Sequence, residues 1–133
     1  MRVSRLVAGY RGRILLSLAV LDAVYAWGIY LASKRPIPPG SFVYIDRYVP
    51  LAVLSVVWLA VAVLCCVNAF RVDDRSGWAV AILIKVFWGA LGLIGWITGD
   101  VRYGYLSAAI WWAFASIVWT ASRWPDPRKP GGF

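Results

Sequence analysis

Long apolar runs separated by short polar segments form the main pattern of this chain. Four runs occupy residues 14–32, 49–70, 79–98 and 104–121. Each is long enough to cross the ~30 Å hydrocarbon core of a bilayer, because an α-helix rises about 1.5 Å per residue. The pattern predicts an all-α integral membrane protein, a four-helix transmembrane bundle that forms a single domain over residues 1–133.

The segments around the first run and after the last one differ in composition. The N-terminal tail, residues 1–13, is basic, whereas the first loop (33–48) and the C-terminal tail (122–133) are rich in proline. Proline interrupts helices, so we expect the middle of the loop to be non-helical and the tail to be extended or disordered. Residues 42–48 of the loop are aromatic and amphipathic, and we expect them to lie back on the membrane surface.

Short charged turns connect the last three runs. Residues 71–77 join the second run to the third, and residues 99–103 join the third to the fourth. Connections this short place neighbouring helices side by side and antiparallel. The sequence therefore predicts two antiparallel hairpins that share the third helix.

Positive charge is distributed unequally over the two sides that this topology defines. The two tails and the second loop hold nine arginines and lysines, and the other two loops hold four. Cytoplasmic loops carry the excess of such residues in membrane proteins. We therefore expect both termini in the cytoplasm and loops 33–48 and 99–103 on the outside.

Two less interesting interpretations of the apolar runs are disfavoured. A soluble helical domain would need polar faces on its helices, but 62% of the residues are hydrophobic and the second and fourth runs have almost no polar face. A cleaved signal peptide would explain the basic tail before the first run. Asp22 interrupts that run, however, and no small-x-small cleavage site precedes Lys34 at a natural distance.

The residue types that most enzymes use are missing from the sequence. It contains no histidine or glutamate, and five of its six acidic residues lie in loops or the C-terminal tail. These absences argue against acid–base pairs, catalytic triads and metal sites, so we expect no enzymatic activity and no cofactor. Adjacent Cys65 and Cys66 stand about 3.8 Å apart at Cα, too close for an unstrained disulfide. We interpret them as small packing residues, with S-palmitoylation as an alternative in a eukaryotic host.

The formal net charge of +8 has a simple explanation in this topology. The basic residues of the chain are scattered among short loops and do not form one patch, so we expect no nucleic-acid partner. The charge instead sets orientation and contacts anionic lipid headgroups. The expected partner is therefore the lipid bilayer.

Two ionisable residues, Asp22 and Lys85, lie inside the predicted spans. Each costs about 2.5–3.5 kcal/mol at a helix centre, so their presence needs a reason. Counted from the cytoplasmic ends, they lie about 12 Å and 10.5 Å deep. Helices one and three run in the same direction, so an intramembrane charge pair can form within one protomer or between neighbours. Such a pair could fix helix register or line a hydrated channel, or Lys85 could snorkel without a partner.

The third run carries glycines at Gly89, Gly92, Gly95 and Gly99. Small residues let helix backbones approach closely in lipid, where hydrophobicity does not drive helix association. We interpret the four glycines as a helix-packing face, used either within the monomer or as the contact of a homo-oligomer.

A basic N-terminus, a proline-rich first loop and four local sequences carry a resemblance to a known group. The local sequences are Asp73-Asp74, residues 85–92, Gly99-Asp100 and residues 104–111. With these features, the chain resembles the small four-span (tetraspan) membrane proteins of actinobacterial phages, some of which are holin-like. The resemblance implies a bacterial inner membrane and a role in lysis or host interaction, and it transfers no functional residue.

Two classes of function follow from this sequence. The first is a non-enzymatic, holin-like protein that oligomerises and permeabilises the membrane. The alternative is an accessory subunit of a larger membrane complex, or a membrane partner in a Rex-type phage exclusion system. The short loops leave little surface for recognition outside the bilayer, which favours the first class slightly.

Overall fold

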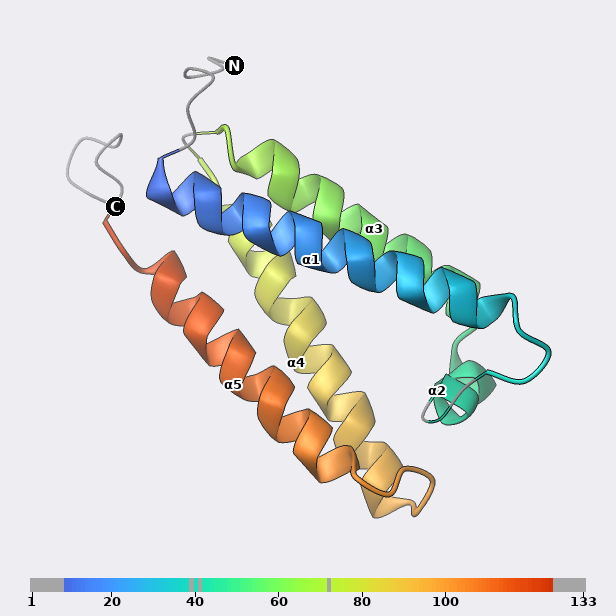
Figure 1. Ribbon diagram of the computed structural model, residues 1–133. Helices are drawn as coiled ribbons and strands as arrows, with labels where there is room; N and C mark the ends of the chain where they lie inside the picture. Colours follow the sequence, from blue (N-terminus) through green and yellow to red (C-terminus); the bar gives the residue numbers. More distant parts are fainter. Residues whose placement is uncertain (1–8, 39, 41, 72, 126–133) are drawn as a thin grey trace.

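A computed structural model describes residues 9–38, 40, 42–71 and 73–125 of the chain. Five helices, and no strand, occupy these residues (Figure 1). They are α1 (Tyr10–Ser33), α2 (Phe42–Tyr48), α3 (Leu51–Asn68), α4 (Arg75–Ile97) and α5 (Gly104–Ser122). All but α2 are long and apolar enough to cross a membrane. The prediction of an all-α chain with four such helices is confirmed.

The ends of the helices differ from the predicted runs by a few residues. Helix α1 begins at Tyr10 and α4 begins at Arg75, each four residues before its predicted start. Both extensions add polar residues, because a helix end can project beyond the apolar layer and keep its charged side chains at the interface. Helix α3 is shorter than its predicted run and ends at Asn68.

The four long helices are arranged as two closely packed pairs. Helix α1 packs along α3 and helix α4 packs along α5, while the α3–α4 hairpin joins the pairs. The pairs lie close together at the end where α1 begins and α5 ends, and they diverge toward the opposite end (Figure 1). We call these the terminal end and the loop end.

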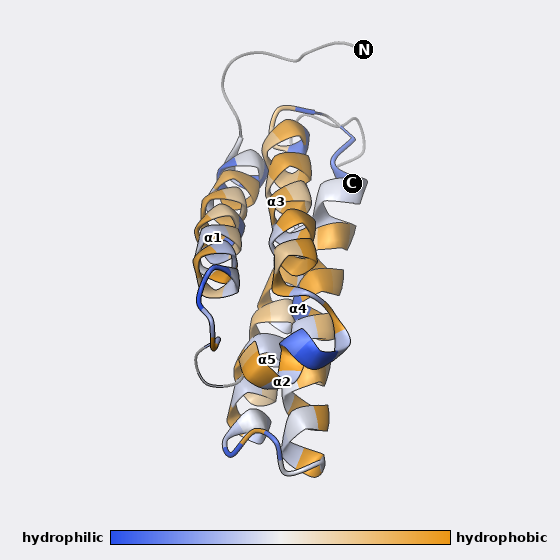
Figure 2. Cartoon of the chain, turned by 90° about the vertical axis from the view of Figure 1, so that its right-hand side faces the viewer, coloured by the Kyte–Doolittle hydropathy of each residue, from blue (hydrophilic) through white to orange (hydrophobic). Residues whose placement is uncertain are grey.

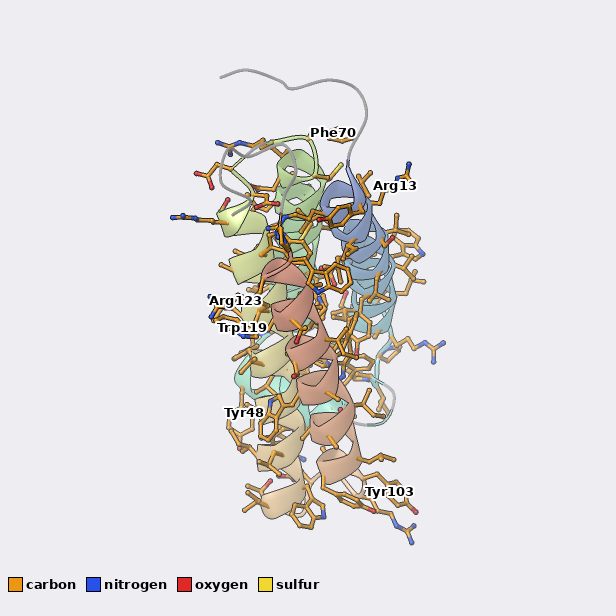
Figure 3. The ribbon with its side chains drawn as sticks, turned by 90° about the vertical axis from the view of Figure 1, so that its left-hand side faces the viewer. Arg13, Tyr48, Phe70, Tyr103, Trp119 and Arg123 are labelled. Carbon is orange, nitrogen blue, oxygen red and sulfur yellow. The ribbon has the colours of Figure 1, made fainter. Side chains whose placement is uncertain are left out.

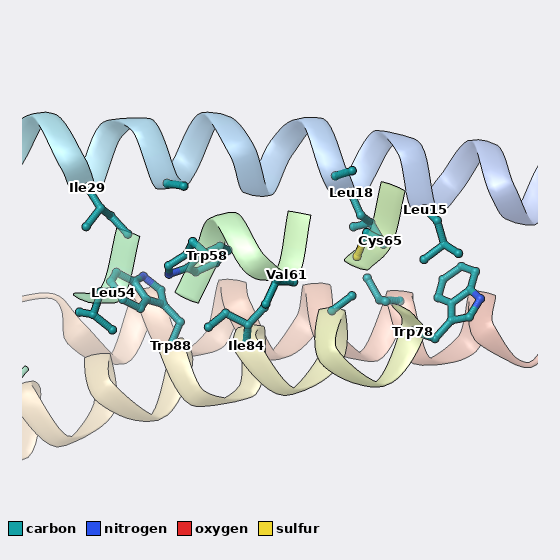
Figure 4. Packing of buried hydrophobic residues seen from close by; sticks show 14 of the residues in the cluster. Leu15, Leu18, Ile29, Leu54, Trp58, Val61, Cys65, Trp78, Ile84 and Trp88 are labelled. Carbon is teal, nitrogen blue, oxygen red and sulfur yellow. The ribbon is translucent and has the colours of Figure 1, made fainter. Parts of the chain in front are cut away.

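The interior is filled by aliphatic side chains and by tryptophan. The most buried members come from α1, α3 and α4 and include Leu51. Leu15, Ile29, Trp58 and Cys65 are equally buried (Figure 4). The outer surface of the helices is also apolar (Figure 2). In a bilayer, lipid tails are as apolar as leucine, so helices with such surfaces would be held together there by close packing and polar contacts more than by exclusion of water.

Helix α2 forms within the segment that was predicted to lie on the membrane surface. The structure buries Tyr44 and Ile45 of this helix, with exposed fractions of 5% and 7%. The Tyr44 ring lies against Gly95 near the end of α4, where an added Cβ would come within 3.0 Å of Cε1. Burial raises the pKa of the Tyr44 hydroxyl, so the ring packs in its neutral form. Helix α2 thus contributes to the packing at the loop end.

Candidate functional site

The central feature of the fold is an ion pair between α1 and α4. Lys85 Nζ lies 3.1 Å from Asp22 Oδ1, and both side chains have an exposed fraction of 0%. The structure therefore brings the two predicted residues together within one chain. Because α1 belongs to one helix pair and α4 to the other, this contact bridges the two pairs.

Aromatic rings from the remaining long helices complete the surroundings of the ammonium group. Lys85 Nζ lies 5.7 Å from the ring centroid of Trp58 on α3 and 5.4 Å from that of Phe114 on α5. A cation is attracted by the negative face of an aromatic ring, more strongly where water is absent. All four long helices therefore contribute a group to the site.

An aromatic cluster closes this site on the side of the loop end. The ring of Tyr25 lies 4.6 Å from that of Trp58, 5.6 Å from that of Trp88 and 5.3 Å from that of Trp111, measured between centroids. Trp58 also contacts Trp88 edge to face at 5.5 Å. Tyr25 is three residues after Asp22, so the cluster begins one helical turn beyond the ion pair. Figure 4 shows Trp58 and Trp88 side by side in this part of the core.

The ion pair is buried, but it is not fully hydrogen-bonded within the described residues. Asp22 Oδ2 and Trp58 Nε1 are buried and have no hydrogen-bond partner within the described residues. A channel-lining charge would contact water, whereas neither member of this pair is exposed. In this structure, the contact ties α1 to α4.

A second buried charge cluster lies at the terminal end. Arg11 Nε and Nη2 donate to Asp74 Oδ2 and Oδ1, both at 3.1 Å. Asp74 Oδ2 also accepts from Trp78 Nε1 at 3.0 Å. Arg11 Nη1 donates to the backbone carbonyls of Ser122 at 2.8 Å and Trp124 at 2.5 Å. One guanidinium therefore connects the start of α1 with the start of α4 and the end of α5.

This second cluster was not foreseen from the sequence. In the sequence, Arg11 contributes only to the charge bias of the tail, and Asp74 only to a charged turn. Both residues border apolar runs, where charged residues are ordinary. Their separation of 63 positions leaves no local spacing signal, so the pairing depends on how α1 and α4 pack.

Three of the four predicted glycines pack against other parts of the same chain. An added Cβ would lie 2.5 Å from Trp112 Nε1 at Gly89 and 3.2 Å from the carbonyl oxygen of Gly104 at Gly92. At Gly95 it would lie 2.6 Å from Val101 Cγ2. These contacts correspond to packing within the monomer, the first of the two predicted uses.

The placement of Gly99 on this packing face is wrong. Helix α4 ends at Ile97, and Gly99 has a φ of +80° with no atom within 4 Å of an added Cβ. Such a positive φ favours glycine because it has no side chain to clash with the backbone. Gly99 therefore makes the turn into α5 and takes no part in helix packing.

The described residues contain no group of three histidines, cysteines or acidic residues that could hold a metal ion. Cys65 is buried and Cys66 is exposed, and both are free thiols. Comparisons with protein-family models, curated proteins and solved structures give no match. The chain is therefore classed by its own features, as a small helical protein with four helices that are able to span a membrane.

Proposed function

We propose that this chain is a non-enzymatic protein of the bacterial inner membrane that serves as an accessory subunit of a larger membrane complex. We also propose that its helices form a four-helix transmembrane bundle with both termini in the cytoplasm. The nine-to-four distribution of arginine and lysine supports the orientation. A membrane partner in an exclusion system of the Rex type belongs to the same class of function.

The observation that carries this proposal is that Asp22 and Lys85 are paired with each other and fully buried. The two charges neutralise each other at 3.1 Å, with side chains that have no exposed surface. A pore needs polar groups along a hydrated path, whereas neither charge of this buried pair is exposed to such a path. The exposed sides of the long helices instead carry large apolar residues such as Val24, Val56 and Ile117, which suit contact with lipid or with another membrane helix.

A holin-like, membrane-permeabilising role is the second candidate, and one observation favours it. The ion pair joins the two helix pairs, which are otherwise connected mainly through α3 and α4. Separating the pairs would expose both charges, and several opened copies could then line a pore. The resemblance to tetraspan phage proteins supports this candidate as well, and it requires a homo-oligomer.

Controlled expression in a bacterium with a membrane-potential dye separates the two candidates. For an accessory subunit, we expect steady potential and unimpaired growth at membrane levels confirmed by immunoblotting. In the native host, the protein should migrate as part of a complex on a native gel, and in an unrelated host it should migrate alone.

Depolarisation by the wild-type chain in the unrelated host would contradict the accessory role and support the holin-like one. In that case, Asp22→Asn should depolarise cells faster than the wild type because it removes one of the contacts that hold the two helix pairs together. Asp100→Asn is the matched control, since it removes an exposed carboxylate at the loop end.

A further inference from the structure

We infer that the terminal end of α4 and α5 holds a binding site for an anionic phospholipid. A pocket of about 300 Å³ lies where α4 begins and α5 ends. Its lining combines basic, aromatic and aliphatic side chains, including Arg75, Arg123, Trp78, Trp119, Trp124 and Ile82. Basic pockets between transmembrane helices and tryptophan at the interface are typical of headgroup binding.

The charge of this pocket is positive after its internal pairs are counted. Arg11 and Asp74 also line it, but their charges cancel through the two 3.1 Å contacts between them. Arg75 and Arg123 remain, so the lining has a formal charge of +2. Neither guanidinium forms an ion pair within the described part of the chain. The pocket is therefore complementary to an anion.

The position of Arg123 points toward a ligand at the level of the lipid headgroups. Its guanidinium lies 5.0 Å from the ring centroid of Trp119, one turn back along α5 (Figure 3). An arginine at a helix end normally extends toward water. Here the guanidinium lies back beside the Trp119 ring, next to the pocket, where a lipid phosphate can reach it.

An apolar groove continues from the pocket along the same two helices. It has a volume of about 340 Å³ and is lined by Ile82, Val86, Trp112, Ala115, Ser116 and Trp119. Ile82 and Trp119 belong to both the pocket and the groove. A phospholipid can place its phosphate beside the arginines and an acyl chain in this groove. A free phosphate would use only the first part, so the combined shape favours a lipid.

Lipid binding to the purified chain tests this inference. Native mass spectrometry of the full chain in detergent would compare retained phosphatidylglycerol with retained phosphatidylcholine at equal concentrations. We expect a clear preference for phosphatidylglycerol. In the double variant Arg75→Gln with Arg123→Gln, the preference should fall by about thirtyfold, which corresponds to roughly 1 kcal/mol for each arginine.

The chain offers a control with the same change of charge. Arg35 and Arg102 are exposed residues of the loop end, and the Arg102 guanidinium also lies near an aromatic ring, 5.5 Å from the centroid of Tyr103. The double variant Arg35→Gln with Arg102→Gln should keep the wild-type preference. Equal loss in both double variants would show a general charge effect and overturn the assigned site.

Two further outcomes separate the lipid from other ligands. Ile82→Trp should reduce phosphatidylglycerol retention because the larger side chain occupies the region shared by pocket and groove. Glycerol 3-phosphate at the same concentration should not displace the lipid. Displacement by this headgroup alone, or a wild-type chain without preference for phosphatidylglycerol, would refute a lipid site.

Discussion

The Asp22–Lys85 pair gives the sharpest test of the packing scheme, through a double-mutant cycle with Asp22→Asn and Lys85→Met. These substitutions remove the charges and keep most of the side-chain volume, so the effect of a new cavity is kept small. The cycle compares the wild type, both single variants and the double variant. It isolates the energy of the contact from the separate effects of each substitution.

The expected magnitudes follow from the burial of the pair. Both side chains are fully buried, so either single variant leaves one charge without its partner and should cost about 3–5 kcal/mol of unfolding free energy. The double variant leaves no unpaired charge and should be more stable than either single variant. The coupling energy should therefore exceed about 3 kcal/mol.

Unfolding in mixed micelles of increasing SDS content measures these differences. Tryptophan fluorescence follows the unfolding of the chain, whose nine tryptophans include Trp58, 5.7 Å from Lys85 Nζ. Circular dichroism provides a second probe, and coincident transitions support two-state unfolding. Folded yield in membranes ranks any variant that is too unstable for the titration.

An exposed ion pair of the same chain provides the matched control. Arg47 Nη1 and Asp100 Oδ1 are 3.5 Å apart, but the side chains are 63% and 30% exposed. Water screens such a pair, so the cycle with Arg47→Met and Asp100→Asn should give a coupling below about 1 kcal/mol. If the coupling of Asp22 with Lys85 is no larger than this control value, the proposed link between the helix pairs is refuted.

Three other predictions concern the terminal cluster, the glycines and the orientation. Arg11→Lys should destabilise the protein by about 2 kcal/mol in the same titration, because lysine cannot form the paired contacts to Asp74. The control Arg13→Lys changes an exposed arginine and should alter stability little. Gly104→Ala should lower the free energy of unfolding by about 1–3 kcal/mol, because the added Cβ would lie 2.0 Å from the Gly92 carbonyl oxygen. The control Gly28→Ala places its Cβ in open space and should be neutral or stabilising. Alkaline phosphatase fused after Gly40 or Val101 should be active and after Ser76 or Phe133 inactive, and activity at either of the last two positions would contradict cytoplasmic termini.

Much of the secondary structure follows directly from the sequence. A backbone in lipid must satisfy its own hydrogen bonds, so a long apolar run has few alternatives to a helix. The run at 104–121 corresponds to α5 to within one residue, because Gly104 and Ser122 border polar segments. The similar depths of Asp22 and Lys85 also follow from helix rise alone.

Only the tertiary structure shows which side of each helix faces the core and which side faces outward. In a soluble protein, polar residues mark the outer face, but here both the core and the outer surface of the helices are apolar. The sequence therefore placed Asp22 at the right depth without showing that Tyr25 and Trp58 close the site around it. The contact between Arg11 and Asp74, 63 positions apart, depends on the same rotation and pairing of helices. Close fit between side chains decides that rotation, and this fit exists only once the helices are packed.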